Sequence, residues 1–108
     1  MEIKPEDFFE VFKKECPKAG KAVEDILSEL AKDSVLDPKT RALINIGLNT
    51  ARMFQPGLRY YISKAIEAGA TKKEIIDTVL ICLVPAGLAT IVTALPVLLE
   101  EFDKLGLK

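Results

Sequence analysis

The chain has 108 residues, of which 49% are hydrophobic and 29% are charged, so it is long enough for one modest core and too apolar to be disordered. Its formal net charge is −1 and its Lys and Arg residues form no run longer than a pair, which excludes the basic face that nucleic-acid binding requires. It has no histidine, so the commonest metal ligand and the usual general base are absent, and we expect a single domain over residues 1–108 with no metal site and no cofactor.

Helical periodicity runs through the sequence, and no segment alternates apolar and polar residues for long enough to predict a strand. A first helix is expected from about Pro5 to Glu15, because proline suits the first helical turn. A second is expected from Pro17 to about Lys32, with an inward face at three- and four-residue spacing. The apolar stripes comprise Phe8, Phe9 and Phe12 in the first helix and Ala19, Val23, Ile26, Leu27 and Leu30 in the second.

A third helix is predicted from an N-cap at Asp37 to about Met53, with Pro38 in its first turn. Proline disfavours a helical residue before it, which predicts a break and a fourth helix from about Pro56 to Ala68. Gly69 then suits a left-handed C-cap. The inward residues are Leu43, Ile46, Gly47, Thr50 and Phe54, then Leu58, Tyr61, Ile62, Ala65 and Ile66, with Arg41, Asn45, Asn49 and Arg52 on a polar side.

Thr71 and Glu74 form the capping-box pattern T-x-x-E, which opens a fifth helix reaching to about Val84. The sequence Pro-Ala-Gly at residues 85–87 should interrupt the chain there. A last helix is expected to follow to about Leu105, with Pro96 producing a kink or a local break.

Residues 78–99 form a run of 22 residues without a charge. Its length alone would permit a membrane span, but Pro85, Gly87 and Pro96 divide it into pieces too short to cross as a straight helix. We expect two helices that are apolar on nearly all sides, which a chain of this size cannot cover by itself. The sequence therefore predicts a homo-oligomer, with the chain itself as partner and no membrane.

Two segments of the chain carry a family resemblance: LDPKTRALINIGLNTARMF at residues 36–54 and YYISKAIEAGATKKEI at residues 60–75. Their order and spacing resemble the carboxymuconolactone decarboxylase and alkylhydroperoxidase-D-like family over about residues 36–84. The resemblance implies an all-α fold, a compact bundle of about six helices of the alkylhydroperoxidase-D-like type. It also implies assembly as a dimer or as a hexamer built from dimers, and peroxidase (peroxiredoxin-type) or decarboxylase activity.

Thiol-active members of that family carry a Glu in the first helix, a Cys-x-x-Cys, and a His four residues after the second Cys. Aligning the shared AGAT segment places Ala42 at the Glu position, Phe54 and Gly57 at the two Cys positions and Tyr61 at the His position. None of these side chains can supply a thiolate. The decarboxylase-type relatives depend on the same His position. The sequence thus predicts a catalytically vacant, small-molecule-binding oligomer, and whether it is an enzyme stays open.

The candidate pocket lining around these positions is Phe54, Gly57, Tyr61, Arg52 and Arg59. The Tyr61 phenol could donate a hydrogen bond to a ligand carbonyl or carboxylate, or its ring could belong to the core. The two arginines could bind an anion bidentately, or they could be solvated or ion-paired. The expected ligand is accordingly a small apolar or anionic molecule.

The two cysteines, Cys16 and Cys82, belong to no Cys-x-x-Cys and no zinc spacing. They are interpreted as reduced thiols of a cytoplasmic protein, while a disulfide between them would need the first and fifth helices to pack together. The charged N-terminal segment lacks the apolar core of a secretory signal. Few amide side chains and many Lys and Glu residues are typical of a thermophile.

Two further functions stay open beside the vacant binding protein. The first is an active enzyme, either a thiol peroxidase through Cys16 or Cys82 or a thiol-independent decarboxylase-like enzyme using Tyr61 and an arginine. The second is a purely structural or partner-binding protein, in which Phe54 and Tyr61 fill the space of a site.

Overall fold

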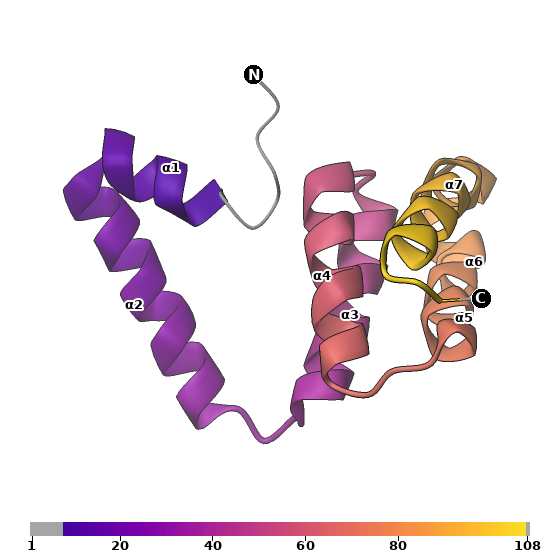
Figure 1. The fold of residues 1–108 in the computed structure, drawn as a ribbon, viewed down its shortest axis with the longest axis horizontal. Coiled ribbons are helices and arrows are strands. Elements are labelled where there is room, and N and C mark those ends of the chain that lie inside the picture. The colour runs from indigo at the N-terminus through magenta and orange to yellow at the C-terminus, as the bar shows by residue number, and fades with distance from the viewer. Residues whose placement is uncertain (1–7, 108) are drawn as a thin grey trace. The chain divides into compact units, whose positions relative to one another are not determined.

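The computed structural model describes residues 8–107, and the helices follow one another through short connections (Figure 1). No strand occurs in that range, which confirms the predicted all-α class for it. The start expected at Pro5 lies outside the described residues. In chain order the helices are α1 (Phe8–Glu15), α2 (Pro17–Asp33), α3 (Pro38–Ala51), α4 (Gln55–Glu67), α5 (Lys72–Ile81), the single-turn α6 (Leu83–Ala86) and α7 (Leu88–Lys104).

The chain divides into two compact units, Met1–Asp37 and Pro38–Lys108. The first unit holds α1 and α2, and the second holds α3 to α7. Every position singled out as candidate pocket lining therefore belongs to the second unit.

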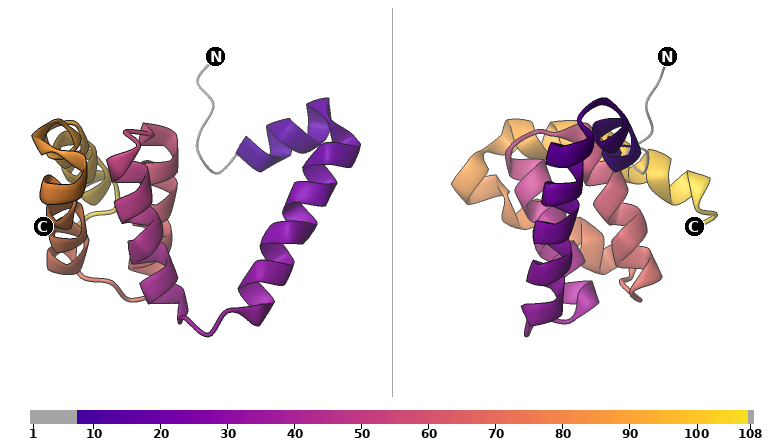
Figure 2. Two further views of the ribbon diagram at one scale, coloured as in Figure 1. Left: turned by 180° about the vertical axis from the view of Figure 1, so that it is seen from behind. Right: turned by 90° about the vertical axis from the view of Figure 1, so that its left-hand side faces the viewer.

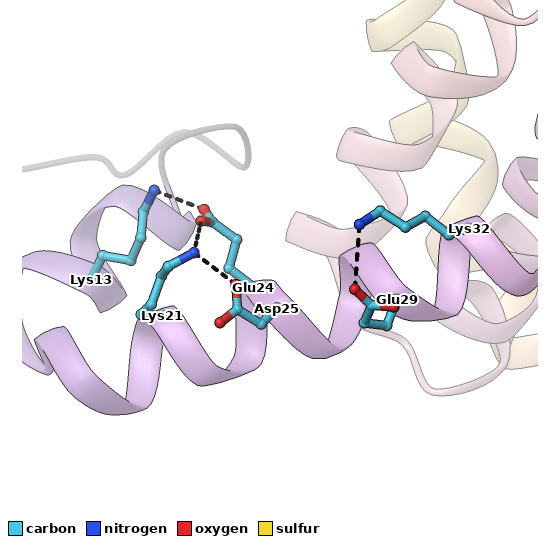
Figure 3. A network of polar contacts seen from close by, with 6 residues as sticks. All are labelled: Lys13, Lys21, Glu24, Asp25, Glu29 and Lys32. Carbon is cyan, nitrogen blue, oxygen red and sulfur yellow. Dashed lines mark hydrogen bonds and ion pairs between the residues drawn. The ribbon is translucent and has the colours of Figure 1, made fainter.

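The first unit is a helical hairpin in which α1 and α2 approach closely at Gly20. A Cβ atom at Gly20 would lie 2.7 Å from the Lys13 Cα, so the distance between the helices requires glycine. Lys13 also pairs with Glu24 across the hairpin at 2.8 Å, and Lys21 pairs with Asp25 along α2 at 2.7 Å (Figure 3). These charges are largely open to solvent, so each pair contributes little stability.

Within the first unit, α1 leaves much of the apolar face of α2 open. Ile26, Leu27 and Leu30 are 58%, 43% and 57% exposed there, because α1 offers 8 residues against the 17 of α2. The burial of this face in the protein stays a prediction.

The hydrophobic core lies in the second unit, where α3 runs beside α4, and α5 and α7 pack on this pair (Figures 1 and 2). Its largest fully buried side chains come from four different helices, which ties them into one body. They include Ile46 from α3, Ile62 from α4, Ile75 and Val79 from α5, and Leu98 and Phe102 from α7.

Two helix ends match their sequence signals. The Thr71 hydroxyl accepts a hydrogen bond from the Glu74 backbone N–H, and the Glu74 carboxylate accepts one from the Thr71 N–H, which confirms the capping box of α5. Gly69, with φ +97°, terminates α4 as predicted. There the Ala70 N–H donates to the Ala65 carbonyl at 2.9 Å, as in a Schellman motif.

α3 ends at Ala51, two residues before the predicted end at Met53. Met53 adopts φ +55°, the left-handed conformation that usually selects glycine. The Phe54 N–H donates to the Asn49 carbonyl at 2.9 Å and the Met53 N–H to the Thr50 carbonyl at 3.0 Å. These two bonds make a Schellman motif, which reverses the chain into α4.

The uncharged run is divided as predicted at residues 85–87, where α6 ends and Gly87 takes φ +95°. α5 stops at Ile81 and not near Val84, and α7 continues through Pro96 as one helix. In the range that the structure describes, no helix is long and apolar enough to cross a membrane.

Candidate functional site

The four positions aligned with the Glu, the two Cys and the His lie on α3 and α4 and around the turn between them. Ala42 is a core residue of α3, 5% exposed. Phe54 is the N-cap residue of α4, Gly57 stands in its first turn and Tyr61 one turn further on. Phe54 is 40% exposed, so its ring does not fill the core as expected for an inward residue.

The space beside Gly57 is occupied by Asn49. A Cβ atom at Gly57 would lie 2.3 Å from the Asn49 Oδ1 and 2.9 Å from the Phe54 ring, far below contact distance. Asn49 is 6% exposed, and its Nδ2 donates to the Asn45 carbonyl at 2.8 Å. The sequence placed Asn49 on a polar side, apart from the inward residues, but the structure buries it because the turn after α3 brings the first turn of α4 over it.

Tyr61 is half-buried and packs against the core of the second unit. Its ring meets that of Tyr60 edge to face, with centroids 5.0 Å apart. Burial raises the pKa of the Tyr61 phenol above its ordinary value, with a smaller contribution from Tyr60. Near neutral pH the group is therefore a protonated hydroxyl, able to donate a hydrogen bond and unsuited to act as a base.

The two candidate arginines are engaged within the protein. The Arg59 Nη1 donates to the Glu101 carboxylate and its Nη2 to Glu100, both at 2.7 Å, which joins α4 to α7. These bonds raise the Arg59 pKa, Glu101 contributing most. The Arg52 guanidinium lies 4.7 Å from the Phe54 ring centroid as a cation–π pair. An anionic ligand at Arg59 would have to displace two carboxylates.

A hollow with an empty volume of about 160 Å³, including the open space at its mouth, lies between the α3–α4 turn and α7. As it stands it has no room for the centre of a water molecule. Of the five candidate lining residues only Phe54 borders this hollow, whereas Arg52, Gly57, Arg59 and Tyr61 do not. The residues that line it are Asn49, Thr50, Met53, Phe54, Gln55, Leu58, Thr90, Thr93 and Ala94.

Thr50 carries a buried hydroxyl without a hydrogen-bond partner. The residue is 1% exposed, and its Oγ1 is the buried side-chain atom among the described residues that lacks a partner. Such an atom loses its hydration without compensation, which costs about 1–3 kcal/mol. The sequence predicted Thr50 to face inward, and this is confirmed, but nothing in the helical pattern signals an unpaired hydroxyl.

The two cysteines are both free thiols. Cys82 is buried at the end of α5, where its thiol donates to the Gly47 carbonyl at 3.4 Å. Burial raises the Cys82 pKa, which lowers the thiolate fraction and the reactivity of this thiol. Cys16 is exposed at the N-cap of α2. Within residues 8–107, no three acidic or cysteine side chains gather as a metal site would require.

A family model matches residues 17–100, from the start of α2 into α7, and it describes the carboxymuconolactone decarboxylase family. The chain belongs to the carboxymuconolactone decarboxylase family. The resemblance found in the two sequence segments is thereby confirmed, and it extends well beyond residues 36–84.

Two relatives of this family member have similar sequences. An uncharacterized protein of Methanocaldococcus jannaschii is 28% identical over 99 residues, which cover 92% of each chain. An uncharacterized 15.0 kDa protein from the nqo9–nqo10 intergenic region of Paracoccus denitrificans is 39% identical over 64 residues, covering 57% of this chain and 48% of that protein. Neither name assigns an activity.

Within the carboxymuconolactone decarboxylase family, the α3–α4 region of this chain thus combines three chemical features. It holds the protonated phenol of Tyr61, a partly open hollow without a charged lining residue, and the unpaired buried hydroxyl of Thr50 in the lining of that hollow. Tyr61 does not border the hollow, so the two hydroxyls are separate hydrogen-bond donors. They offer neither a nucleophile nor a base with a pKa near neutrality.

Proposed function

We propose that this member of the carboxymuconolactone decarboxylase family is a homo-oligomeric small-molecule-binding protein that does not carry out thiol chemistry at the α3–α4 turn. The observation that carries the proposal is the contact between Gly57 and Asn49. A side chain at position 57 would overlap the Asn49 amide, whose Oδ1 lies 2.3 Å from the Cβ position. Both the thiol and the room for it are therefore missing.

The remaining titratable groups support the same function. Cys82 is buried with a raised pKa, so it is a poor nucleophile. The raised pKa of Tyr61 removes it as a base, and the pairing of Arg59 with Glu100 and Glu101 weighs against an arginine-assisted decarboxylation. Binding requires none of these groups to ionise.

Self-association is supported by large apolar side chains that the second unit leaves exposed. Ile81, Val84, Leu88 and Val92 are 68%, 92%, 65% and 62% exposed on it, although they lie in the uncharged run. Exposed apolar side chains of this size are typical of an interface. A second copy of the chain would cover it with matching apolar side chains.

Peroxide consumption with a dithiol reductant tests the catalytic half of the proposal. We expect no turnover above buffer for the wild type, for Cys16→Ala or for Cys82→Ala. Turnover that one of these substitutions abolishes would identify a thiol peroxidase and overturn the proposal.

A further inference from the structure

Two partly exposed side chains of the α3–α4 turn border the hollow, which is partly open to solvent. Met53 and Phe54 belong to the turn itself, are 47% and 40% exposed, and line the hollow. Arg52 covers the Phe54 ring from outside as a cation–π pair. Rotation of Phe54 outward would leave a space one ring in size.

Thr50 differs from other helical threonines of the second unit. Thr78 donates its hydroxyl to the Glu74 carbonyl, Thr90 to that of Gly87 and Thr93 to that of Ala89, at 2.7–2.8 Å. Helical threonines ordinarily satisfy their hydroxyls in this way. The Thr50 hydroxyl makes no such bond and stays unpaired in the wall of the hollow.

The chemistry of the lining restricts what such a ligand can be. No residue that lines the hollow is charged, so an ion would lose its hydration without a counter-charge. Three polar groups of the lining are already engaged, namely the hydroxyls of Thr90 and Thr93 and the Nδ2 of Asn49. Two polar side chains of the lining remain, the amide of the exposed Gln55 and the hydroxyl of the buried Thr50. Of these, the Thr50 hydroxyl is the buried group without a partner, and it can donate a hydrogen bond to a ligand oxygen.

On the basis of the binding function above, we propose that the hollow is the binding site and that its ligand is an uncharged molecule, one ring in size, with one acceptor oxygen. The ring takes the place that Phe54 leaves, between Leu58 and Ala94. The oxygen accepts the hydrogen bond of Thr50. The ligand thus supplies the partner that this buried hydroxyl lacks.

Cyclohexanone is a suitable probe, because it is neutral, has one six-membered ring and carries one carbonyl acceptor. Titration into the full-length, nitrogen-15-labelled protein is expected to shift the backbone amides of Thr50, Phe54, Leu58 and Ala94 in a saturable manner. Cyclohexanecarboxylate, of the same ring size but charged, should bind at least about tenfold more weakly, since it pays a desolvation cost without a counter-charge.

Thr50→Val and Thr93→Val form a matched pair of variants. Both remove a hydroxyl from the wall of the same hollow at nearly constant shape, but only the Thr50 hydroxyl lacks a partner. Thr50→Val is expected to weaken cyclohexanone binding by about fivefold, the worth of one hydrogen bond, and Thr93→Val to leave it within about twofold. Thr50→Val should also leave the urea midpoint of unfolding unchanged or raised.

Four results would overturn the proposal. They are an equal loss of binding in both variants, tighter binding of the carboxylate, a lowered urea midpoint for Thr50→Val, or no saturable shift at the hollow. Saturable shifts confined to other residues would show that cyclohexanone binds elsewhere on the protein. They would refute the hollow as the site but not the proposed binding function. Cysteine-dependent peroxide turnover would refute the proposed function by itself, whatever cyclohexanone does.

Discussion

At the residue scale, the candidate site depends on a steric conflict: any side chain at position 57 would overlap the Asn49 amide. Gly57→Ala would place a methyl group 2.3 Å from the Asn49 Oδ1. Alanine gains about 1 kcal/mol of helix propensity over glycine, but overpacking a tight site costs about 1–3 kcal/mol. We expect a net loss of about 1 kcal/mol in the free energy of unfolding, measured by urea denaturation.

The double variant Asn49→Ala/Gly57→Ala is the control, because removing the amide makes room for the new methyl group. We expect it to be more stable than the sum of the two single changes predicts. A Gly57→Ala protein as stable as the wild type would mean that Asn49 yields easily. A cysteine would then fit at position 57, and the case for a lost thiol site would rest on composition alone.

The AGAT segment sets the register from which the sequence predicts the residues at the four family positions, and that alignment stays a prediction. The burial of Asn49 could not be predicted from the sequence. Its spacing of four from Asn45 places both on one polar stripe, and only the reversal of the chain at Met53 brings Gly57 against it. The unpaired hydroxyl of Thr50 likewise depends on side-chain rotation, which leaves no trace in hydrophobic periodicity.

Met53 holds the turn between α3 and α4 in the left-handed conformation at φ +55°. That conformation costs a residue with a Cβ about 1–2 kcal/mol, which glycine avoids. We therefore expect the free energy of unfolding of Met53→Gly to be about 1 kcal/mol higher than that of Met53→Ala. Both variants lose the same side-chain contacts, so the comparison isolates the backbone conformation. Thermal unfolding of the two variants measures the difference. If the two variants are equally stable, the turn has relaxed out of the left-handed conformation.

The capping box at the start of α5 makes stability depend on pH. Hydrogen bonding from the Thr71 backbone, and then pairing with Lys39 at 2.9 Å, lowers the pKa of Glu74 in the folded state. Its contribution is therefore complete above the unfolded value of about 4.3 and is lost as the pH falls through the lower folded value. In Glu74→Gln, which keeps a capping side chain, the melting temperature should fall less between neutral and acid pH.

The exposed change Asp77→Asn on the same helix is the matched control for that experiment, because it removes one negative charge without touching the capping box. A wild-type melting temperature with the same acid dependence as that of Glu74→Gln would show that neither the hydrogen bond from the Thr71 backbone nor the pair with Lys39 lowers the Glu74 pKa in solution.

Helix boundaries with chemical signals were predictable, and those without were not. The capping box at Thr71 and the glycine at Gly69 place the start of α5 and the end of α4 correctly. Methionine has no preference for the left-handed conformation, so the end of α3 was misplaced by two residues. Periodicity identifies the apolar face of α2 but not what covers it, and α1 leaves Ile26, Leu27 and Leu30 exposed within the first unit.

At the scale of the whole molecule, the apolar surface of α7 leads to a prediction about assembly. Leu88 and Val92 lie one turn apart on α7 and are 65% and 62% exposed. Leu88→Glu combined with Val92→Glu places two charges there, which an apolar contact between copies cannot accommodate without a large desolvation cost. By sedimentation velocity, we expect the wild type to exceed the mass of one chain and the double variant to approach it.

Lys73→Glu, on the exposed surface of α5, alters charge without altering the apolar surface and should leave the assembly intact. Circular dichroism of the double variant must retain its helix content, because both replaced side chains lie outside the core. A monomeric wild type, or a double variant that sediments like the wild type, would exclude this surface of α7 as the contact. The exposed Ile26, Leu27 and Leu30 of α2 would then be the next apolar surface to test in the same way.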